Sequence, residues 1–528
     1  MLRKLNATAL VPQLERALVH RNVREGFALL DEAFKGSPKL DIGTPDALQF
    51  LLCLAQWTDL GYRDLDFLDE VAAGLSSVDQ ERLQVLDFFR LKLFDSFRTM
   101  ASEQFEDSIG MLDLVLRAGE PVLPDYLVFL GNFWKGRVHR KLGDYEHALA
   151  HILRAQEIAV HAKAPRLVAV TQIHESWLAF QRGDRPYAFQ LLDAAEKVLK
   201  PTGHALSLGN IESARGRFVR RSGEYTRALG HFESAISIYR KRYPEHPNLA
   251  RALVNAAYVK RLIALGLRPR QGGESAVGAV HAKSLKILGE ALVLLGQAGE
   301  IYALHHHQGG TGSVLVNAAH IHLESGDIDQ AETAAHTALA LGEEKLDLIL
   351  MARAQIVQSS VSLARAEEQV GEEQDIALHA NLAVQHAESA IELALKTQNK
   401  RLLAEAYIAR GMAATDDYFR DWQVAKDYAS KATALLSSDD RDHLLRTLGD
   451  LKSKLLGATR IEETLRLWSD GQLGDKTFQQ VQEEFAELVI PKVWLRSGKN
   501  VTQVSKTLSI SPKKVRRILR NVREHSEG

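Results

Sequence analysis

The stretch that decides the fold is Gly136-Arg-Val-His-Arg-Lys-Leu-Gly-Asp-Tyr-Glu-His-Ala-Leu-Ala-His-Ile-Leu-Arg-Ala155. Its centre, Gly143-Asp-Tyr, returns as Gly183-Asp-Arg and Gly223-Glu-Tyr, so the glycines are 40 residues apart. A fourth copy begins at Gly326-Asp-Ile. Each glycine is followed at two fixed distances by alanines, which are Ala148 and Ala155, Ala188 and Ala195, Ala228 and Ala235, and Ala331 and Ala338. A fixed period of this length is the signature of a repeat protein.

The repeat predicts pairs of antiparallel helices joined by a tight turn at the glycine. Small alanines on the second helix of each pair let the first helix approach closely, and neighbouring pairs stack along a continuous apolar seam. The pattern resembles the tetratricopeptide repeat, in the longer variety of kinesin light chains and bacterial regulators. The resemblance is strong over residues 132–240, and it returns at 312–342 and at 376–436.

We therefore expect an all-α fold, a tetratricopeptide-like α-solenoid followed by a small helix-turn-helix domain. The expected parts are degenerate repeats that cap the array at 1–130, repeats at 131–440, a helical connector at 441–475 and the helix-turn-helix domain at 476–528. Two interruptions of the array are expected, a loop at 267–282 that is rich in glycine and basic residues, and an acidic one at 367–375.

Arrays of this kind present one face of each first helix to a concave groove, and this face is rich in arginine and aromatic residues here. Counting from the turn glycines places there Arg137, Arg140, Lys141, Trp177, Phe180, Arg217, Arg220 and Arg221. Such side chains would suit an acidic peptide, a phosphorylated ligand or an acidic segment of the same chain. The alternative is a solvated basic helix face.

Two asparagines, in Asn255-Ala-Ala and Asn317-Ala-Ala, occupy similar places on two first helices. They resemble the asparagines whose side-chain amides bind a peptide backbone in arrays of this variety. The alternative is an ordinary polar helix position. The lysine and asparagine clamp of chaperone-binding arrays does not occur at the matching positions, which disfavours that class of partner.

The C-terminal region carries a strong positive charge. From Leu488 to Arg523 there are ten Lys and Arg residues and no Asp or Glu. The rest of the chain then holds 56 basic against 67 acidic residues, although the net charge of the whole is −1. A basic end on an acidic body predicts a nucleic-acid ligand for that end. It also raises the hypothesis that the tail docks on the body and is thereby autoinhibited.

Within this region the sequence predicts two short helices around a turn. Asn500 can cap the helix over 501–508, Ser509-Ile-Ser forms the turn, and Pro512 suits the first position of the next helix. Val504, Leu508 and Ile510 face inward, as do Val515, Ile518, Leu519 and Val522. Ser511, Lys513, Arg516 and Arg517 are expected to reach base edges, with Lys514 exposed on the same face. Thr502, Gln503, Lys506 and Arg520 are expected at phosphates.

The segment from Gly498 through Asn500-Val-Thr to Ile510-Ser and the basic helix resembles the Fis-type helix-turn-helix of bacterial transcription activators. The resemblance implies a bacterial protein that binds double-stranded DNA. Three departures from that pattern are Ser505 in place of alanine, Ser509 in place of the turn glycine, and Pro512 in place of arginine. Ser509 would need a left-handed backbone. The alternative is a basic helical tail that contacts proteins.

The motifs of common enzyme classes are missing. There is no G-x-x-x-x-G-K-[ST] loop, and the nearest segment, Gly309-Gly-Thr-Gly-Ser, lacks the lysine. Adjacent histidines in His305-His-His point to different faces of a helix, which disfavours a metal site. We expect no enzyme activity, no cofactor and no metal. The single cysteine, Cys53, fits a reducing cytosol. Without a signal peptide or an uninterrupted apolar run of about 18 residues, we expect a cytoplasmic protein.

Together these features predict a DNA-binding transcriptional regulator whose helical-repeat body binds a peptide or protein and controls the tail. A homodimer would suit a two-fold DNA site. The apolar face of Phe478, Val481, Phe485 and Leu488 is expected either to form that dimer or to pack under the DNA-binding unit. The rival hypothesis is a non-enzymatic interaction scaffold whose basic tail docks a protein.

Overall fold

The computed structural model describes residues 5–35, 39–44, 46–267, 274–368, 373–437, 440–469 and 476–526. Over these residues the chain is built of helices and contains no β-strand, which confirms the all-α prediction. It divides into two compact units. The first comprises Met1–Gln358, Ser389–Ala406 and Leu435–Arg446, and the second comprises Ser359–Glu388, Tyr407–Ala434 and Thr447–Gly528.

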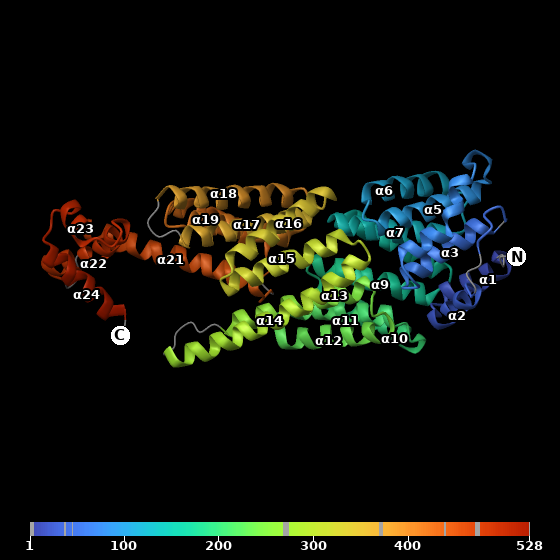
Figure 1. Cartoon of the computed structure of the whole chain (residues 1–528), viewed down its shortest axis with the longest axis horizontal. Helices are drawn as coiled ribbons and strands as arrows, with labels where there is room; N and C mark the ends of the chain where they lie inside the picture. The colour runs from blue at the N-terminus through green and yellow to red at the C-terminus, as the bar shows by residue number, and fades with distance from the viewer. Residues whose placement is uncertain are drawn as a thin grey trace. The chain divides into compact units, whose positions relative to one another are not determined.

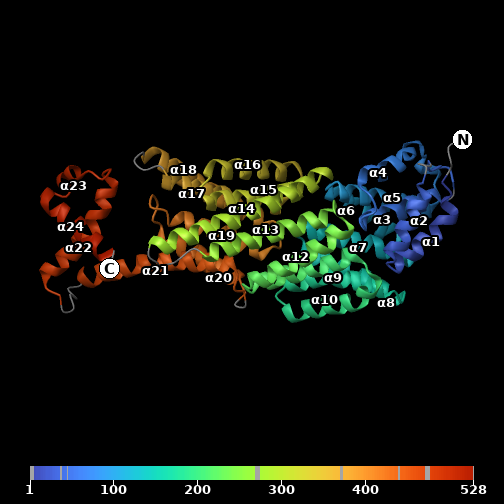
Figure 2. The same ribbon diagram turned by 60° about the horizontal axis from the view of Figure 1, so that its bottom comes forward.

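The first unit begins with helices that carry no repeat signature (Figure 1). They are α1 (Ala7–Val19), α2 (Val23–Ala33), α3 (Ala47–Asp59), α4 (Leu65–Val71), α5 (Val85–Ala101) and α6 (Phe105–Leu114), with short helical turns at Ala73–Ser77, Gln80–Arg82 and Val115–Gly119. Ten further helices follow as antiparallel pairs that lie side by side (Figures 1 and 2). The pairs are α7 (Asp125–Leu142) with α8 (Tyr145–His161), α9 (Pro165–Gln181) with α10 (Arg185–Leu199), α11 (Ala205–Arg221) with α12 (Tyr225–Arg242), α13 (Pro247–Leu267) with α14 (Glu274–Leu304), and α15 (Gln308–Ser325) with α16 (Ile328–Glu344).

The Gly-Asp motif explains the turn within each pair. Gly143 adopts a left-handed backbone with φ 81°, which ends α7, and the next residue, Asp144, caps α8 by accepting a hydrogen bond from the His147 N–H at 3.3 Å. Asp184 and Asp327 cap α10 and α16 in the same way. One dipeptide therefore ends the first helix of a pair and begins the second.

The repeat alanines lie in the core, as the pattern predicts. All eight alanines that follow the four turn glycines are fully buried. Gly136 and Gly216 on the first helices also meet the second helices, since a Cβ at Gly216 would lie 2.9 Å from ring atoms of Phe232. Close approach between paired helices thus depends on small residues from both sides.

Four helices follow α16, and the division into units runs through each of them and through the helix that comes next. They are α17 (Leu348–Glu368), α18 (Glu373–Leu395), α19 (Lys400–Ala414) and α20 (Trp422–Leu435). The chain ends with α21 (His443–Ser469), α22 (Phe478–Arg496), α23 (Val501–Thr507) and α24 (Pro512–Ser526). In the second unit α22, α23 and α24 pack around a small core of Ile490, Val504, Val515 and Ile518.

The expected loop at 267–282 is mostly wrong. Helix α13 runs to Leu267 and α14 begins at Glu274, so residues 274–282 are helical, while 268–273 lie outside the described residues. Apart from its glycine, the segment from Glu274 contains few helix breakers, and the buried seam of α14 that follows supports continuation of the helix. At 367–375, α17 ends at Glu368 and α18 begins at Glu373, and 369–372 lie outside the described residues.

Helix α14 is unusually apolar although no uninterrupted apolar run occurs in the chain. Its segment Val280–Leu304, with a mean hydropathy of 1.4, is the one described helix whose length and composition would allow it to cross a membrane. Leu288, Ala291, Leu295 and Ala298 of this segment are buried in the core that α14 shares with α13. We interpret it as a long repeat helix.

Candidate functional site

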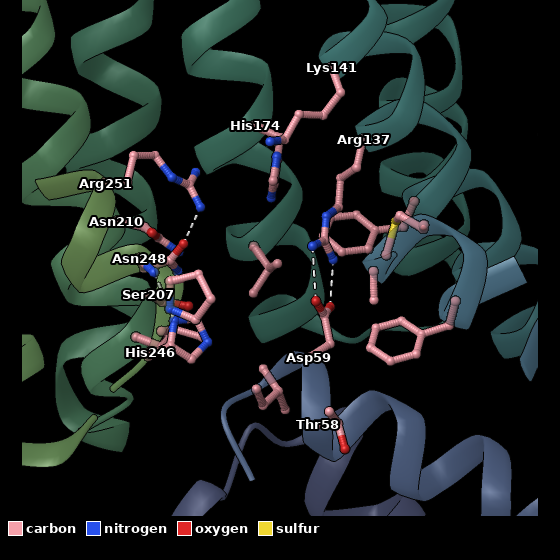
Figure 3. A pocket seen from close by; sticks show the side chains of 18 of the residues that line it. Thr58, Asp59, Arg137, Lys141, His174, Ser207, Asn210, His246, Asn248 and Arg251 are labelled. Atoms are coloured by element: carbon pink, nitrogen blue, oxygen red, sulfur yellow. Dashed lines mark hydrogen bonds and ion pairs between the residues drawn. The ribbon is translucent and has the colours of Figure 1, made fainter. Parts of the chain in front are cut away.

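A cavity of about 300 Å³ lies in the first unit, between the helices that precede the repeats and the first helices of the pairs (Figure 3). Helices α7, α9, α11 and α13 each contribute residues spaced three or four apart, which lie on one face of a helix. On α7 these are Phe133, Arg137, Arg140 and Lys141, and on α9 they are Val170, Ile173, His174 and Trp177. The end of α3 adds Thr58 and Asp59.

The lining is strongly cationic, with seven Lys or Arg side chains against three carboxylates. Each of the three carboxylates already has partners. Asp59 forms two bonds with the Arg137 guanidinium, one of them 2.9 Å long. Asp64 caps α4, and Glu103 accepts the Gly309 N–H at 2.8 Å.

Of the seven cations, only Arg137 pairs with a carboxylate within the described parts of the chain, and four of the other six lie on the first helices of the pairs. Among the described residues, no carboxylate lies within 4.0 Å of the charged groups of Arg140, Lys141, Arg217 or Arg251. The guanidinium of Arg140 lies 5.4 Å from the centre of the Trp177 ring. Burial, followed by the nearby Arg251, lowers the pKa of Arg140 to about 10 and that of Arg217 to about 9. Both guanidiniums are charged at neutral pH, and each has a buried Nε without a hydrogen-bond partner within the described chain.

Four buried histidines of the cavity are neutral at pH 7. Burial lowers the pKa of His246, His307 and His204 to about 3, and it holds the pKa of His174 well below its ordinary value. The cations near these imidazoles act in the same direction. The ring of His174 packs edge-on against Phe133 at 5.1 Å between centres. These rings therefore offer aromatic surface and neutral nitrogen atoms.

Half of the groove residues predicted from the sequence meet at this cavity, namely Arg137, Arg140, Lys141, Trp177 and Arg217. The other residues lie elsewhere. Phe180 is buried and stacks on Phe218 at 4.0 Å, and Arg220 lies over the Tyr258 ring at 4.6 Å.

Arg221 instead joins a cluster around Asp440, a residue that is only 3 % exposed. Arg185 and Arg401 also pair with the Asp440 carboxylate, and Arg401 reaches Asp442 as well. An acidic segment of the same chain thus neutralises Arg221. Such a segment is one of the three ligand classes that the sequence suggests for the groove.

The two asparagines bond within their own helices. The amide of Asn255 donates to the Arg251 carbonyl oxygen and that of Asn317 to the Ser313 carbonyl oxygen, each at 2.7 Å. Neither residue lines the cavity. Arg251 and His174 do line it and were missed, although Arg251 lies one turn before Asn255 on the same helix. Asp59 was missed because Gly61, the glycine that follows α3, lacks the aspartate and the first alanine of the repeat pattern used for counting.

The turn of the C-terminal three-helix unit is held by side chains. The Asn500 side chain accepts hydrogen bonds from the Thr502 and Gln503 N–H groups at 3.0 and 3.1 Å, which confirms it as the cap of α23. Ser509 has a left-handed backbone with φ 52°, as its place in the turn requires. The hydroxyl of Ser505 donates to the Ile510 carbonyl oxygen across this turn, a bond that alanine could not make.

All the residues predicted to contact DNA are exposed: Thr502, Gln503, Lys506, Ser511, Lys513, Lys514, Arg516, Arg517 and Arg520. Two of them are already engaged. Arg517 pairs with Glu483 of α22, and the Ser511 hydroxyl accepts the Lys514 N–H at 3.2 Å. Val515 and Ile518 face the core as predicted, Leu519 is half-buried, and the side chain of Val522 lies outside the described residues.

The apolar face of α22 is largely uncovered. Phe478 is 68 % exposed and Phe485 48 % exposed, whereas Val481 is buried and Leu488 half-buried. Phe478, Phe485 and Leu488 are absent from the core of the three-helix unit.

The histidines at 305–307 do not converge on one point, because His305 contacts the Glu245 carbonyl oxygen and His307 contacts Glu103. A different group, His139, Asp144 and His147, brings its ligand atoms within 4.8 Å of one another. Its carboxylate is the cap of α8 and lies 3.1 and 2.7 Å from the two imidazole Nδ1 atoms. These hydrogen bonds account for the arrangement.

Comparison with known proteins identifies one repeat directly. A tetratricopeptide-repeat family model matches residues 131–159. No curated protein matches the chain. Among solved structures, the chain is similar to a Rap protein complexed with competence and sporulation factor (13% identity, 80% of this chain and 99% of the other, TM-score 0.45). It is also similar to the apo form of the quorum sensor NprR from B. thuringiensis (14% identity, 81% and 98%, TM-score 0.38) and to aspartyl phosphate phosphatase F from Bacillus subtilis (12% identity, 84% and 97%, TM-score 0.39). Likeness at these scores carries no argument about function.

Proposed function

We propose that this protein is a DNA-binding transcriptional regulator of bacterial type, in which the helical-repeat body binds a partner and controls a C-terminal Fis-like helix-turn-helix at 476–528. The observation that carries the proposal is the outer face of α24. Lys513, Lys514, Arg516 and Arg520 are exposed there on one short helix, and no acidic residue occurs between Leu488 and Arg523. A short helix that pairs a buried apolar face with such a basic face suits the major groove of DNA.

The partner of the body is proposed to bind in the cationic cavity. The cavity supports a peptide or protein ligand with negative charge, because unpaired guanidiniums recognise carboxylate and phosphate groups. The body is proposed to act without enzyme activity or cofactor.

A second copy of the chain is the proposed partner for the apolar face of α22. Exposed phenylalanines at 478 and 485 favour this assignment over packing beneath the three-helix unit. Two linked units would match the two halves of a palindromic site. Light scattering should show that Phe485→Asp lowers the mass from that of a dimer to that of one chain. A single-chain mass for the unaltered protein would refute the dimer.

The DNA proposal is tested by selecting bound duplexes from a random pool with the full chain. We expect enrichment of a palindromic sequence, with affinity that falls steeply as salt rises. The triple variant Lys513→Ala, Arg516→Ala and Arg520→Ala should lose the enrichment, since base contacts by Lys513 and Arg516 carry specificity and a phosphate contact by Arg520 carries affinity.

The matched control is Lys396→Ala, Lys400→Ala and Lys426→Ala, which removes the same charge from exposed positions outside the tail. It should retain both the enriched sequence and the affinity. If both triple variants lose enrichment and affinity equally, DNA binding depends on the overall charge of the protein and not on the tail. No enrichment by the unaltered chain would refute the regulator and favour the interaction scaffold, in which the tail docks a protein.

A further inference from the structure

In the described parts of the chain, the cationic cavity lacks negative charge to balance its buried cations. Another cluster of arginines in the same chain is balanced by a buried carboxylate. At the Asp440 cluster, arginines from three helices converge on one buried carboxylate. At the cavity, Arg140, Lys141, Arg217 and Arg251 line one space, and no carboxylate of the described residues lies within 4.0 Å of their charged groups. Burying like charges together is unfavourable unless an anion joins them.

The four cations surround one space. Figure 3 shows Arg251 entering from α13 on one wall, and Arg137 and Lys141 entering from α7 on the opposite wall, with His174 between them. Arg137 is held by Asp59, whereas the guanidinium of Arg251 has, within the described parts of the chain, only the side-chain oxygen of Asn248 as a partner. All four cations line the cavity, and none of them is neutralised by a neighbouring acid within the described residues.

We propose that the cavity binds an anion of the phosphate class that carries at least two negative charges, as a free small molecule or as a phosphorylated side chain of the partner. This inference rests on the proposed binding of a partner by the body. It goes further by naming the group that is recognised.

Phosphate fits this lining better than a single carboxylate does. The lining holds seven cations and three occupied carboxylates, so one carboxylate would leave most of the excess charge uncompensated. A phosphate monoester carries about −1.5 to −2 and three strong acceptor oxygens. Several guanidiniums can bond to it at once from different directions, whereas a carboxylate offers only two oxygens.

Recognition of a peptide backbone by the two predicted asparagines is not supported at this cavity. The asparagines that would hold a peptide backbone, Asn255 and Asn317, bond within their own helices and do not line it. The aromatic surface of Trp177 and Phe133 remains for the part of the ligand that carries the phosphate. Charge, with aromatic packing, is the chemistry that this lining offers.

The test is calorimetric titration of the full chain with pyrophosphate, and with citrate as an anion whose charge comes from carboxylates alone. Pyrophosphate should bind, raise the melting temperature and compete with ADP or with a phosphoserine peptide. Which of these two binds tighter identifies the source of the phosphate. Binding of citrate or of an unphosphorylated glutamate peptide with equal or greater affinity would overturn the proposal, as would no binding of pyrophosphate.

Arg217→Gln and Arg220→Gln form a matched pair on α11, because Arg217 lines the cavity and Arg220 lies over Tyr258 instead. Arg217→Gln should weaken pyrophosphate binding roughly 10- to 100-fold, the effect of losing a charged hydrogen bond. It should also raise the melting temperature of the ligand-free protein, since an uncompensated buried charge is removed. A purely structural arginine would lower the melting temperature.

Arg220→Gln should leave pyrophosphate binding unchanged. Equal weakening by both variants would overturn the assignment of the cavity. The selection of DNA duplexes reports on the tail independently, so enrichment of a DNA site without pyrophosphate binding would refute the phosphate site alone.

Discussion

Replacing Gly216 by alanine has two opposing effects on the stability of one repeat, a gain in helix preference and a loss from overpacking. Inside a helix the change favours folding by about 1 kcal/mol, because alanine is the better helix former. The new Cβ, however, would lie 2.9, 2.9 and 3.1 Å from three ring atoms of Phe232, which is itself fully buried. Ordinary contacts of this kind lie between 3.4 and 4 Å. Overpacking of a rigid core costs about 1–3 kcal/mol. We therefore expect Gly216→Ala to destabilise the repeat by about 1 kcal/mol.

The control is Gly230→Ala on the partner helix α12, where an added Cβ meets nothing within 4 Å. It should stabilise the repeat by about 1 kcal/mol. The difference between the two variants cancels the helix preference and isolates the packing term of about 1–3 kcal/mol. Native-state hydrogen exchange at the amides of α11 and α12 measures the local free energy of opening. If both variants protect these amides equally, close approach at this glycine does not hold the pair together.

Three further perturbations address other parts of the chain. Asp440→Asn leaves three arginines facing a neutral group and should lower the free energy of unfolding in urea by about 3 kcal/mol; a loss below about 1 kcal/mol would show that the cluster is well solvated. His204 is 2 % exposed and its folded pKa is about 3, so as pH falls below about 6.5 the unfolded state takes up the proton first. The contribution of His204 alone to stability should therefore decline by about 1.4 kcal/mol per pH unit toward pH 3. Acid titrations of stability should show a shallower decline for His204→Gln between pH 6.5 and 5, and an unchanged slope would contradict the buried neutral imidazole. Ser509→Gly should relieve the left-handed turn by about 1 kcal/mol and slow hydrogen exchange in α23, whereas faster exchange would mean that serine suits this turn.

The repeats were predictable because their signal is local and recurs. A glycine with positive φ and two buried alanines recur at fixed spacing in all four copies, a capping aspartate recurs in three of them, and each has one physical role. The start of α14 was not predictable in this way. Its glycines and basic residues suggest a loop, but the helix begins at Glu274, ahead of the seam at Leu288 and Ala291 that packs on α13. Packing between helices determines where such a helix begins, and this packing gives no signal in the residues at the boundary itself.

Half of the predicted groove residues line the cavity, because part of its lining follows from local spacing and part depends on distant residues. Counting from the turn glycines found Arg137, Arg140 and Arg217, because helical spacing within a repeat fixes the face on which they lie. The same counting could not distinguish Arg217 from Arg221, which lies one helical turn further along α11. That distinction depends on Asp440, more than 200 residues away in the sequence. The pairing of Arg137 with Asp59 likewise depends on a helix outside the repeats.

The Asp440 cluster also has a consequence for the order in which the protein is completed during synthesis. Arg185 and Asp440 are separated by 255 positions. At a translation rate of about 5–20 residues per second, roughly 13–50 seconds pass between the emergence of the arginine and that of its partner. For that interval the early repeats exist with an unsatisfied group of arginines, open to any acidic molecule nearby. The exposure ends when the segment around Asp440 has been synthesised, so these ion pairs form after the early repeats have folded.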